Sequence, residues 1–279
     1  MRRRTFISRT AAATVATTLF PSMSYKESVP RTGLILYTVR GEMNSDPAGT
    51  LDAVAALGYN WIEAADYNDG LFYKMKPAEF RKMIESRGMS LVSSHNEMSE
   101  SDYELIIGNA AEAGLRYVVV PSLPRRVFES VDSVKRAAEF LNQAGEKCRE
   151  LGMKAGFHNH TIEFSPVEGI VPLDILLENT DPELVCFELD LAWATSGGAS
   201  PVEYFDRYPG RFELWHIKDL SVDKKDATLG EGIIDFAPIF DLKKAAGMQY
   251  FFIEQDDCVT HSPLESIEIS RNYLVSNIL

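Results

Sequence analysis

The chain has 279 residues, of which 45% are hydrophobic and 25% are charged. This length allows one large domain or two ordinary ones, and the composition is typical of a globular protein. Asp and Glu outnumber Lys and Arg by 41 to 28, giving a formal net charge of −13, so a basic surface for nucleic acid is not expected.

The first residues have the features of an export signal. Arg2 to Arg4 precede a run of small and weakly apolar residues from Ala11 to Phe20, and RRTFI resembles the twin-arginine signal. We therefore predict a signal over residues 1–22, a linker over residues 23–32 and a periplasmic location. Because no later stretch approaches ~18 consecutive apolar residues, no membrane span is expected in the mature chain. The alternative is a basic N-terminal helix on a cytosolic protein.

A helix followed by a strand recurs along the rest of the chain. Five times an amphipathic pattern ends at a glycine that precedes a short strand-like run: Gly58, Gly88, Gly114, Gly152 and Gly247. Glycine just past a helix end accepts the left-handed conformation that closes the last turn. Before four of these glycines, apolar residues at three-to-four spacing predict helices over Pro47–Leu57, Pro77–Ser86, Tyr103–Ala113 and Val131–Leu151.

Eight short apolar runs predict strands. They are Leu34–Val39, Trp61–Ala65, Leu91–His95, Tyr117–Pro121, Ala155–Asn159, Cys186–Asp190, Leu214–Lys218 and Phe251–Glu254. Eight strands that alternate with helices in this length favour a single α/β domain over residues 33–279, a closed (β/α)₈ TIM barrel, rather than an open doubly wound sheet. No GxGxxG motif follows any of the strands, so a dinucleotide fold is not supported.

Polar side chains follow the apolar part of these predicted strands. In a parallel barrel the carboxyl ends of all strands meet at one rim, where TIM-barrel active sites lie. We therefore expect distant parts of the chain to contribute to one cavity. The residues at these ends are Arg40, Asp66, His95, Ser122, the HNHTIE group from His158 to Glu163, Asp190, His216 with Lys218, and Glu254.

The last four strand ends carry carboxylates and imidazoles, which predict one divalent metal ion. Three oxygen ligands and one nitrogen ligand are available there: Glu163, Asp190, His216 and Glu254. This set suits Mn²⁺ as the first choice and Co²⁺, Mg²⁺ or Zn²⁺ as alternatives, while the scarcity of cysteine excludes a structural thiolate site. Each residue alone has a structural explanation, such as a helix cap or an ion pair, but four at successive strand ends favour a metal site.

Seven motifs carry a family resemblance: LILYTVR, SSHNE, HNHTIEF, ELDLAWATSGGASP, HIKD, LGEGIIDF and FIEQD. With them the chain from about Gly33 onward resembles the xylose-isomerase-like TIM-barrel superfamily, specifically its sugar phosphate isomerase/epimerase family. In relatives a divalent metal is held by Glu, Asp, His and Glu from strands five to eight. The resemblance implies that Asp190, His216 and Glu254 are ligands, because they match the last three positions.

The fifth strand departs from the family pattern. Many relatives have Glu where this chain has His158, and some relatives with an HxH sequence, inosose dehydratases among them, use a Glu slightly downstream. On this basis Glu163 is the expected fourth ligand, with His160 second, and His158 is free to act as a base. The alternative is that one of the two histidines only orients a ligand.

The resemblance and the candidate metal site imply chemistry at a carbon next to a carbonyl of a sugar-like substrate. A base, His158, Glu163 or Glu254, would remove the α-proton, and the metal would stabilise the resulting enediolate. Returning the proton to the other face epimerises the substrate, and returning it to the adjacent carbon isomerises it. Loss of the β-oxygen dehydrates or cleaves it.

Several side chains are expected to contact the substrate or to shape the rim. Lys218 faces the same side of its strand as His216, so it can bind an oxyanion or hydroxyl, or alternatively pair with a neighbouring carboxylate. The other expected contacts are His95, His160 and Trp193, with Trp61 as a second aromatic candidate. Gly230 and Gly232 indicate a tight loop over the rim.

These observations predict a metal-dependent isomerase or epimerase of a non-phosphorylated sugar or keto-sugar, because export disfavours a phosphorylated metabolite. The alternatives on the same site are a 3-keto-glycoside lyase or hydratase and an inosose-type dehydratase. A non-catalytic sugar-binding protein is an alternative of another class. A phosphodiesterase like the apurinic-site endonucleases would need more than the five histidines present and a basic groove. The sequence leaves the oligomeric state open, a homo-oligomer included.

Overall fold

The computed structural model describes residues 30–279, so the predicted signal over residues 1–22 and most of the linker over residues 23–32 lie outside the described residues. Eight parallel strands form a closed barrel in the order β1-β12-β9-β8-β7-β6-β5-β2. They are β1 (Gly33–Ile35), β2 (Trp61–Ala64), β5 (Ser90–His95), β6 (Tyr117–Val120), β7 (Lys154–His158), β8 (Val185–Asp190), β9 (Leu214–Ile217) and β12 (Tyr250–Ile253). The predicted (β/α)₈ TIM barrel is confirmed.

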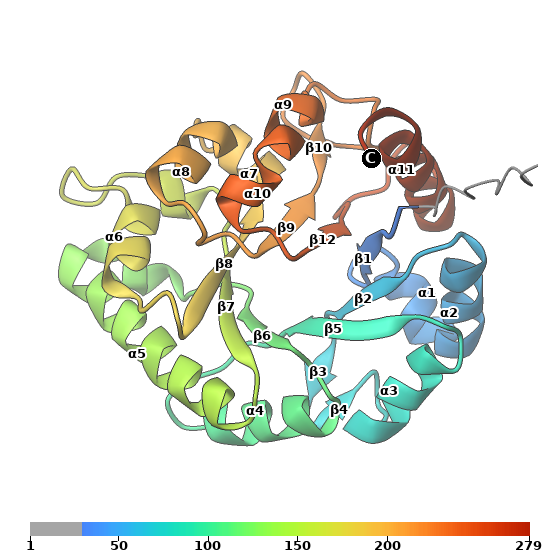
Figure 1. The fold of residues 1–279 in the computed structure, drawn as a ribbon, viewed down its shortest axis with the longest axis horizontal. Helices are drawn as coiled ribbons and strands as arrows, with labels where there is room; N and C mark the ends of the chain where they lie inside the picture. Colours follow the sequence, from blue (N-terminus) through green and yellow to red (C-terminus); the bar gives the residue numbers. More distant parts are fainter. Residues whose placement is uncertain (1–29) are drawn as a thin grey trace, which may run out of the picture.

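Helices surround the barrel strands on all sides (Figure 1). They are α1 (Arg40–Ser45), α2 (Pro47–Ala56), α3 (Pro77–Glu85), α4 (Tyr103–Glu112), α5 (Val131–Glu150), α6 (Pro172–Asn179), α7 (Leu191–Ser196), α8 (Pro201–Arg207), α9 (Phe236–Asp241), α10 (Lys243–Ala246) and α11 (Pro263–Asn277), with 3₁₀ turns η1 (Arg125–Glu129) and η2 (Ile162–Phe164). Within residues 30–279, none of the helices has the length and apolarity that crossing a bilayer requires.

The glycines that predicted the helix ends adopt the expected left-handed backbone conformation. All five of those glycines have a positive φ, between 73° and 90°. The four helices predicted before them begin at the predicted residues and each ends one residue early, which is within the ordinary fraying of a helix end.

The first strand is shorter than predicted. Leu36 N still bonds to Glu63 O at 3.0 Å, but the amides of the next residues turn back to carbonyls three residues earlier and lead into α1. Thr38 Oγ1 then accepts the N–H of Gln255 at 3.0 Å, which ties the end of β1 to the end of β12. The LILYTVR run is therefore a short strand followed by a turn that reaches the rim.

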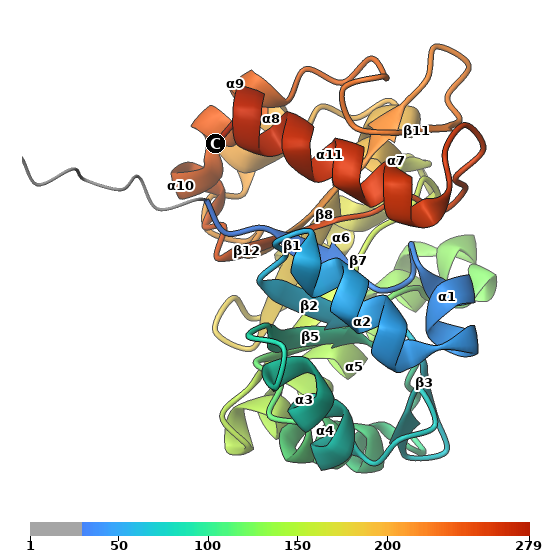
Figure 2. The ribbon, with the colours of Figure 1, turned by 90° about the vertical axis from the view of Figure 1, so that its right-hand side faces the viewer.

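The last helix covers the outside of the barrel where the first strand, β1, pairs with the last strand, β12. Figure 2 shows α11 above α2 on the outside of the barrel, next to β1 and β12. Tyr59 donates its hydroxyl to Ile267 O of α11 at 2.8 Å, and Arg271 Nε donates to Thr32 Oγ1 at 3.1 Å.

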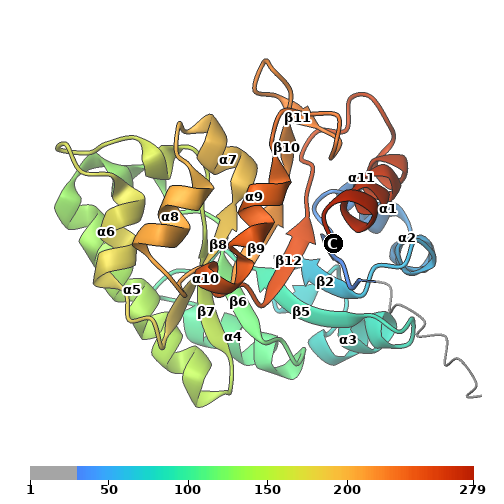
Figure 3. The same cartoon turned by 45° about the horizontal axis from the view of Figure 1, so that its top comes forward.

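A small hairpin, β10 (Asp219–Leu220) with β11 (Asp226–Ala227), projects beyond the end of β9 (Figure 3). The buried Asp219 carboxylate accepts the N–H groups of Gly230 and Gly232, each at 3.1 Å, so the expected tight loop is present. Asp226 Oδ2 accepts the N–H of Asp256 at 2.7 Å. The hairpin thus holds the two loops that follow β9 and β12 against the rim.

Side chains on the barrel strands alternate between the helix layer and the barrel interior. On β8, Phe187 and Leu189 pack in the core cluster beneath the helices, and Glu188 and Asp190 point the other way. The lower part of the interior is a separate apolar cluster of Ile35, Val92, Tyr117, Val119, Cys186, Leu214 and Phe252. Above this layer the interior becomes polar, and the candidate site begins there.

Candidate active site and metal centre

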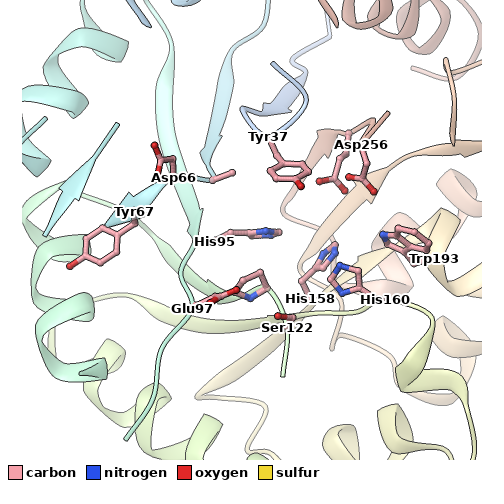
Figure 4. Close-up of a pocket in the computed structure, with 13 residues that line it drawn as sticks. Tyr37, Asp66, Tyr67, His95, Glu97, Ser122, His158, His160, Trp193 and Asp256 are labelled. Atoms are coloured by element: carbon pink, nitrogen blue, oxygen red, sulfur yellow. The ribbon is translucent and has the colours of Figure 1, made fainter. Parts of the chain in front are cut away.

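A cavity of about 430 Å³ opens at the C-terminal rim of the barrel (Figure 4). In the close-up, Tyr37 and Asp256 lie on one side, Glu97 and Ser122 on the other, and His95 and His158 stand between them. The full lining is Tyr37, Ala65, Asp66, Tyr67, His95, Glu97, Pro121, Ser122, His158, His160, Trp193, Glu254 and Asp256. The sequence therefore placed the cavity at the correct end of the strands.

Four side chains, which we name the outer cluster, bring their ligand atoms within 4.8 Å of one another: His158, Asp190, His216 and Glu254. His158 and Glu254 line the cavity, and Asp190 and His216 do not. All four are buried, and His216 Nδ1 lies 2.9 Å from Glu254 Oε2. They come from the ends of β7, β8, β9 and β12, as predicted for the last four strands. Three of the four predicted ligands thus lie together.

Asp190 does two things at once because it ends β8 and begins α7. Its Oδ1 accepts the N–H of Trp193 at 2.7 Å and caps the helix, while its buried Oδ2 has no hydrogen-bond partner. Burial raises the pKa of Asp190 to about 8 against the opposing effect of Lys218. A buried carboxylate oxygen without a partner is unusual in native proteins, and a cation would satisfy it.

The outer cluster therefore fits a divalent cation. Two imidazole and two carboxylate ligands suit Mn²⁺, Co²⁺ or Zn²⁺, and the unpartnered Asp190 oxygen supplies a ligand atom that the protein alone leaves unused. The cavity above the cluster leaves room for a substrate oxygen to complete the coordination.

Glu163 lies beside the cluster and is not a member of it. Its Oε2 accepts the backbone N–H of His160 at 2.8 Å, and its buried Oε1 has no hydrogen-bond partner. Burial raises the pKa of Glu163 to about 7. The structure therefore puts His158 in the fourth position of the group, where the sequence pointed to Glu163.

This difference leads to a prediction about the fourth ligand. Glu163→Gln should keep the hydrogen bond to His160 and retain the metal content of the wild type, whereas His158→Ala should lose most of it. Elemental analysis of the desalted proteins measures both. If Glu163→Gln lost the metal and His158→Ala retained it, the downstream glutamate would be the ligand after all.

Lys218 is fully buried among carboxylates and does not line the cavity itself. Its ammonium contacts Asp256, lies 3.6 Å from Glu254 Oε2 and 4.0 Å from Asp190 Oδ2, and sits 4.6 Å from the centre of the Trp193 ring. Burial alone would lower its pKa, but these carboxylates outweigh burial and raise the pKa. The alternative in which Lys218 pairs with neighbouring carboxylates describes this geometry, and a direct substrate contact stays a prediction.

The other predicted contacts are divided between the two ends of the barrel. His95, His160 and Trp193 line the cavity, and the rings of His160 and Trp193 are 5.7 Å apart. Burial lowers the pKa of His160 to about 4, so it is neutral at pH 7. Trp61 begins β2 at the opposite end and packs edge-on against Tyr250, with ring centres 5.0 Å apart. Trp61 therefore belongs to the lower core and is not part of the cavity.

Sequence reasoning missed three acidic residues of the site. Glu63 and Glu188 lie in the middle of β2 and β8, fully buried and facing the histidines, and Asp256 lies in the loop after β12. A signal for Glu188 was available, because it is two residues before Asp190 and therefore faces the same side of the strand. Glu63 and Glu188 were missed because neither is the last residue of its strand.

The fold and the outer cluster define the class: a TIM-barrel protein with a candidate metal centre in the mouth of its barrel. The chain belongs to the xylose isomerase-like TIM barrel family, whose model matches residues 51–274. The resemblance found in the motifs is thereby confirmed.

The chain is similar to one curated protein and to two proteins of known structure. An inosose dehydratase from Geobacillus kaustophilus (strain HTA426) is 28% identical over 272 residues, 80% of this chain and 85% of that protein. A sugar phosphate isomerase/epimerase from Parabacteroides distasonis ATCC 8503 is 29% identical, with a TM-score of 0.81 over 91% of this chain and 96% of that one. The IolI protein, solved with a bound zinc atom, is 14% identical with a TM-score of 0.71 over 88% and 97%, and shares the fold.

Proposed function

We propose that this protein is a divalent-metal-dependent isomerase or epimerase that removes a proton from the carbon beside a carbonyl group of a non-phosphorylated sugar or keto-sugar. The observation that supports this most directly is the outer cluster, two of whose residues line a cavity of about 430 Å³. That volume lies in the range of small-molecule sites, about 300–1,000 Å³. The isomerase/epimerase relative supports the same reaction class.

The cavity wall favours an uncharged substrate. None of its lining residues is Lys or Arg, and four are carboxylates: Asp66, Glu97, Glu254 and Asp256. A phosphate group would meet repulsion there, whereas hydroxyl groups can donate hydrogen bonds to carboxylates. Trp193 and Tyr37 offer aromatic faces for a sugar ring. Export through the twin-arginine-type leader, which we propose from the sequence alone, also favours an uncharged sugar, because phosphorylated metabolites are mostly kept in the cytoplasm.

We assign cation binding, the positioning of carboxylates and proton abstraction to different residues of the site. His158, Asp190, His216 and Glu254 would hold the cation, which when bound acts as a Lewis acid on a carbonyl and acidifies the neighbouring C–H bond. Lys218 holds Asp190, Glu254 and Asp256 close together. Burial, followed by the nearby Glu254, raises the pKa of Asp256 to about 6, a value suited to accepting a proton near neutral pH. We assign proton abstraction to Asp256, which lines the cavity and contacts Lys218. Of the bases expected from the sequence, His158 and Glu254 would hold the cation, which leaves Glu163 as the other candidate.

Deuterium exchange tests this proposal. The metal-loaded protein should catalyse exchange of the α-proton of a free sugar or a 3-keto-glycoside in D₂O, and removal of the metal with a chelator should slow exchange about a thousandfold or more. Adding Mn²⁺ should restore it. NMR spectroscopy follows the signal of the exchanging proton. Exchange that is indifferent to metal would overturn the metal-dependent mechanism. A ligand affinity unchanged by metal removal, without any exchange, would favour the sugar-binding alternative.

A lyase reaction on the same site is the second candidate, because the inosose dehydratase relative matches 80% of this chain. Isomerisation and epimerisation conserve the mass of the substrate, whereas dehydration removes one water and glycoside elimination releases a second molecule. Mass spectrometry of the product mixture separates these outcomes once exchange has been detected.

A further inference from the structure

A second group of ligand-type side chains lies in the barrel interior below the outer cluster. His95, His158, Glu188 and His216 bring ligand atoms within 4.8 Å of one another. Glu63 joins them, because its Oε2 lies 2.7 Å from His216 Nε2 and 3.7 Å from His95 Nε2. We name these five residues the inner cluster. It shares two histidines with the outer cluster and has three residues of its own.

The inner cluster is centred on one carboxylate oxygen. Glu188 Oε2 lies 2.7 Å from His95 Nε2, 3.2 Å from His216 Nε2 and 3.4 Å from His158 Nδ1. The three imidazole rings stand with their centres 4.6–5.2 Å apart. Three ring nitrogens and two carboxylates thus face the same small volume, as the ligands of a metal ion do.

Several of these polar atoms have no hydrogen-bond partner although they are buried. They are Glu63 Oε1, Glu188 Oε1 and His158 Nδ1. Two carboxylates in the interior also require about two positive charges for compensation. Two imidazolium groups provide them, or one divalent cation does, and the cation would also engage oxygens and a nitrogen that are otherwise unpaired.

We propose that the inner cluster is a second position for a divalent cation, selective for nitrogen-preferring ions such as Zn²⁺ or Co²⁺. Imidazole favours these ions, whereas carboxylate-rich sets suit Mn²⁺ and Mg²⁺. The inner cluster offers three imidazoles and the outer cluster two.

The two positions exclude each other because they share histidines. His216 directs Nδ1 to Glu254 in the outer cluster and Nε2 to Glu63 and Glu188 in the inner cluster. A neutral imidazole has one nitrogen lone pair, so when one ring nitrogen binds an ion the other carries the proton. The protein therefore holds one ion per chain. An inner ion would occupy His158 and His216 and so exclude an ion from the outer cluster, and zinc should therefore inhibit the proposed reaction; this consequence rests on the proposed function.

Two variants separate the positions. Asp190→Asn removes a carboxylate of the outer cluster alone, and Glu188→Gln removes one of the inner cluster alone. The metal-free mature protein and both variants are titrated with Co²⁺, followed by visible absorption, which is strong for four- or five-coordinate Co²⁺. Competition with Zn²⁺ and Mn²⁺, with elemental analysis after desalting, gives affinities and stoichiometry.

The expected result is about one ion per chain in the wild type. Asp190→Asn should still bind about one Zn²⁺ or Co²⁺ and lose Mn²⁺, while Glu188→Gln should keep Mn²⁺ and bind Zn²⁺ about a hundredfold more weakly. Unchanged Zn²⁺ affinity in Glu188→Gln, or no Zn²⁺ in Asp190→Asn, would overturn the inner site and leave Glu188 as a group that orients histidines. Two ions per wild-type chain would overturn the mutual exclusion.

A further variant keeps the test decisive if Glu188→Gln does not fold. His95→Ala removes an inner ligand that is partly exposed at the cavity, and it should weaken Zn²⁺ binding in the same way while sparing Mn²⁺. The proposed function fails separately, if the Mn²⁺-loaded wild type exchanges no substrate proton, and that failure would leave these binding results unchanged.

Discussion

His216→Ala is expected to lose the bound divalent ion and to lower kcat/KM by about a thousandfold or more. His216 is fully buried and belongs to both clusters, with one ring nitrogen facing Glu254 and the other facing Glu63 and Glu188. Loss of the cation removes several kcal/mol of transition-state stabilisation, and each tenfold in rate corresponds to about 1.4 kcal/mol. Elemental analysis and the deuterium-exchange assay measure the two effects.

The matched control is His261→Ala. His261 is the histidine whose Nε2 pairs with Glu231 at 3.1 Å in an exposed contact outside the cavity. This variant should keep both the metal and the activity. Circular dichroism shows whether His216→Ala folds, and Glu254→Ala is a second variant with the same expectation. A folded His216→Ala protein with the metal content of the wild type would contradict the metal centre.

Lys218→Met is expected to lower the free energy of unfolding of the metal-free protein by about 3–5 kcal/mol. Methionine fills a similar volume but removes the ammonium that lies among Asp190, Glu254 and Asp256. Removing one partner of a buried ionic group leaves the other charges uncompensated. Because a bound cation supplies positive charge to Asp190 and Glu254, saturating Mn²⁺ should recover part of the loss. Urea unfolding with and without metal measures both quantities.

Lys154→Met is the control for Lys218. Lys154 begins β7 at the opposite end of the barrel and pairs with Glu213 at 2.5 Å, with its side chain 22% exposed. Lys154→Met should lower the free energy of unfolding by less than Lys218→Met does. This effect should not depend on metal, because Lys154 begins β7 and the metal-ligand candidate His158 ends it. Equal stability of metal-free Lys218→Met and wild type would show that the ammonium does not hold the carboxylates together.

Most of the fold was predictable because its signals are local. Gly58, Gly88, Gly114, Gly152 and Gly247 each take up the left-handed conformation that their position after a helix required. The exception was LILYTVR, where the apolar pattern continues past Ile35 but the backbone turns at Thr38 to meet Gln255. The partner of that turn is more than 200 positions away, so no local pattern could indicate it.

The site was predictable where residue type and strand end coincide. Asp190, His216 and Glu254 were expected as ligands and lie together in the outer cluster, but their binding of a metal stays a prediction. The fourth member is decided by how the chain turns after His158. The 3₁₀ turn η2 directs the Glu163 carboxylate back to the N–H of His160, and the spacing of residues does not reveal that direction.

The sequence by itself determined the barrel, the end of the barrel that carries the cavity and the kinds of ligand available, because strand period, glycine caps and residue chemistry act over a few neighbouring residues. The export signal and periplasmic location stay predictions. Only the tertiary structure decided that Glu63 and Glu188 face the histidines from across the barrel and that Lys218 is shared by three carboxylates. Those relations depend on barrel closure and register, which bring together side chains from strands far apart in the chain.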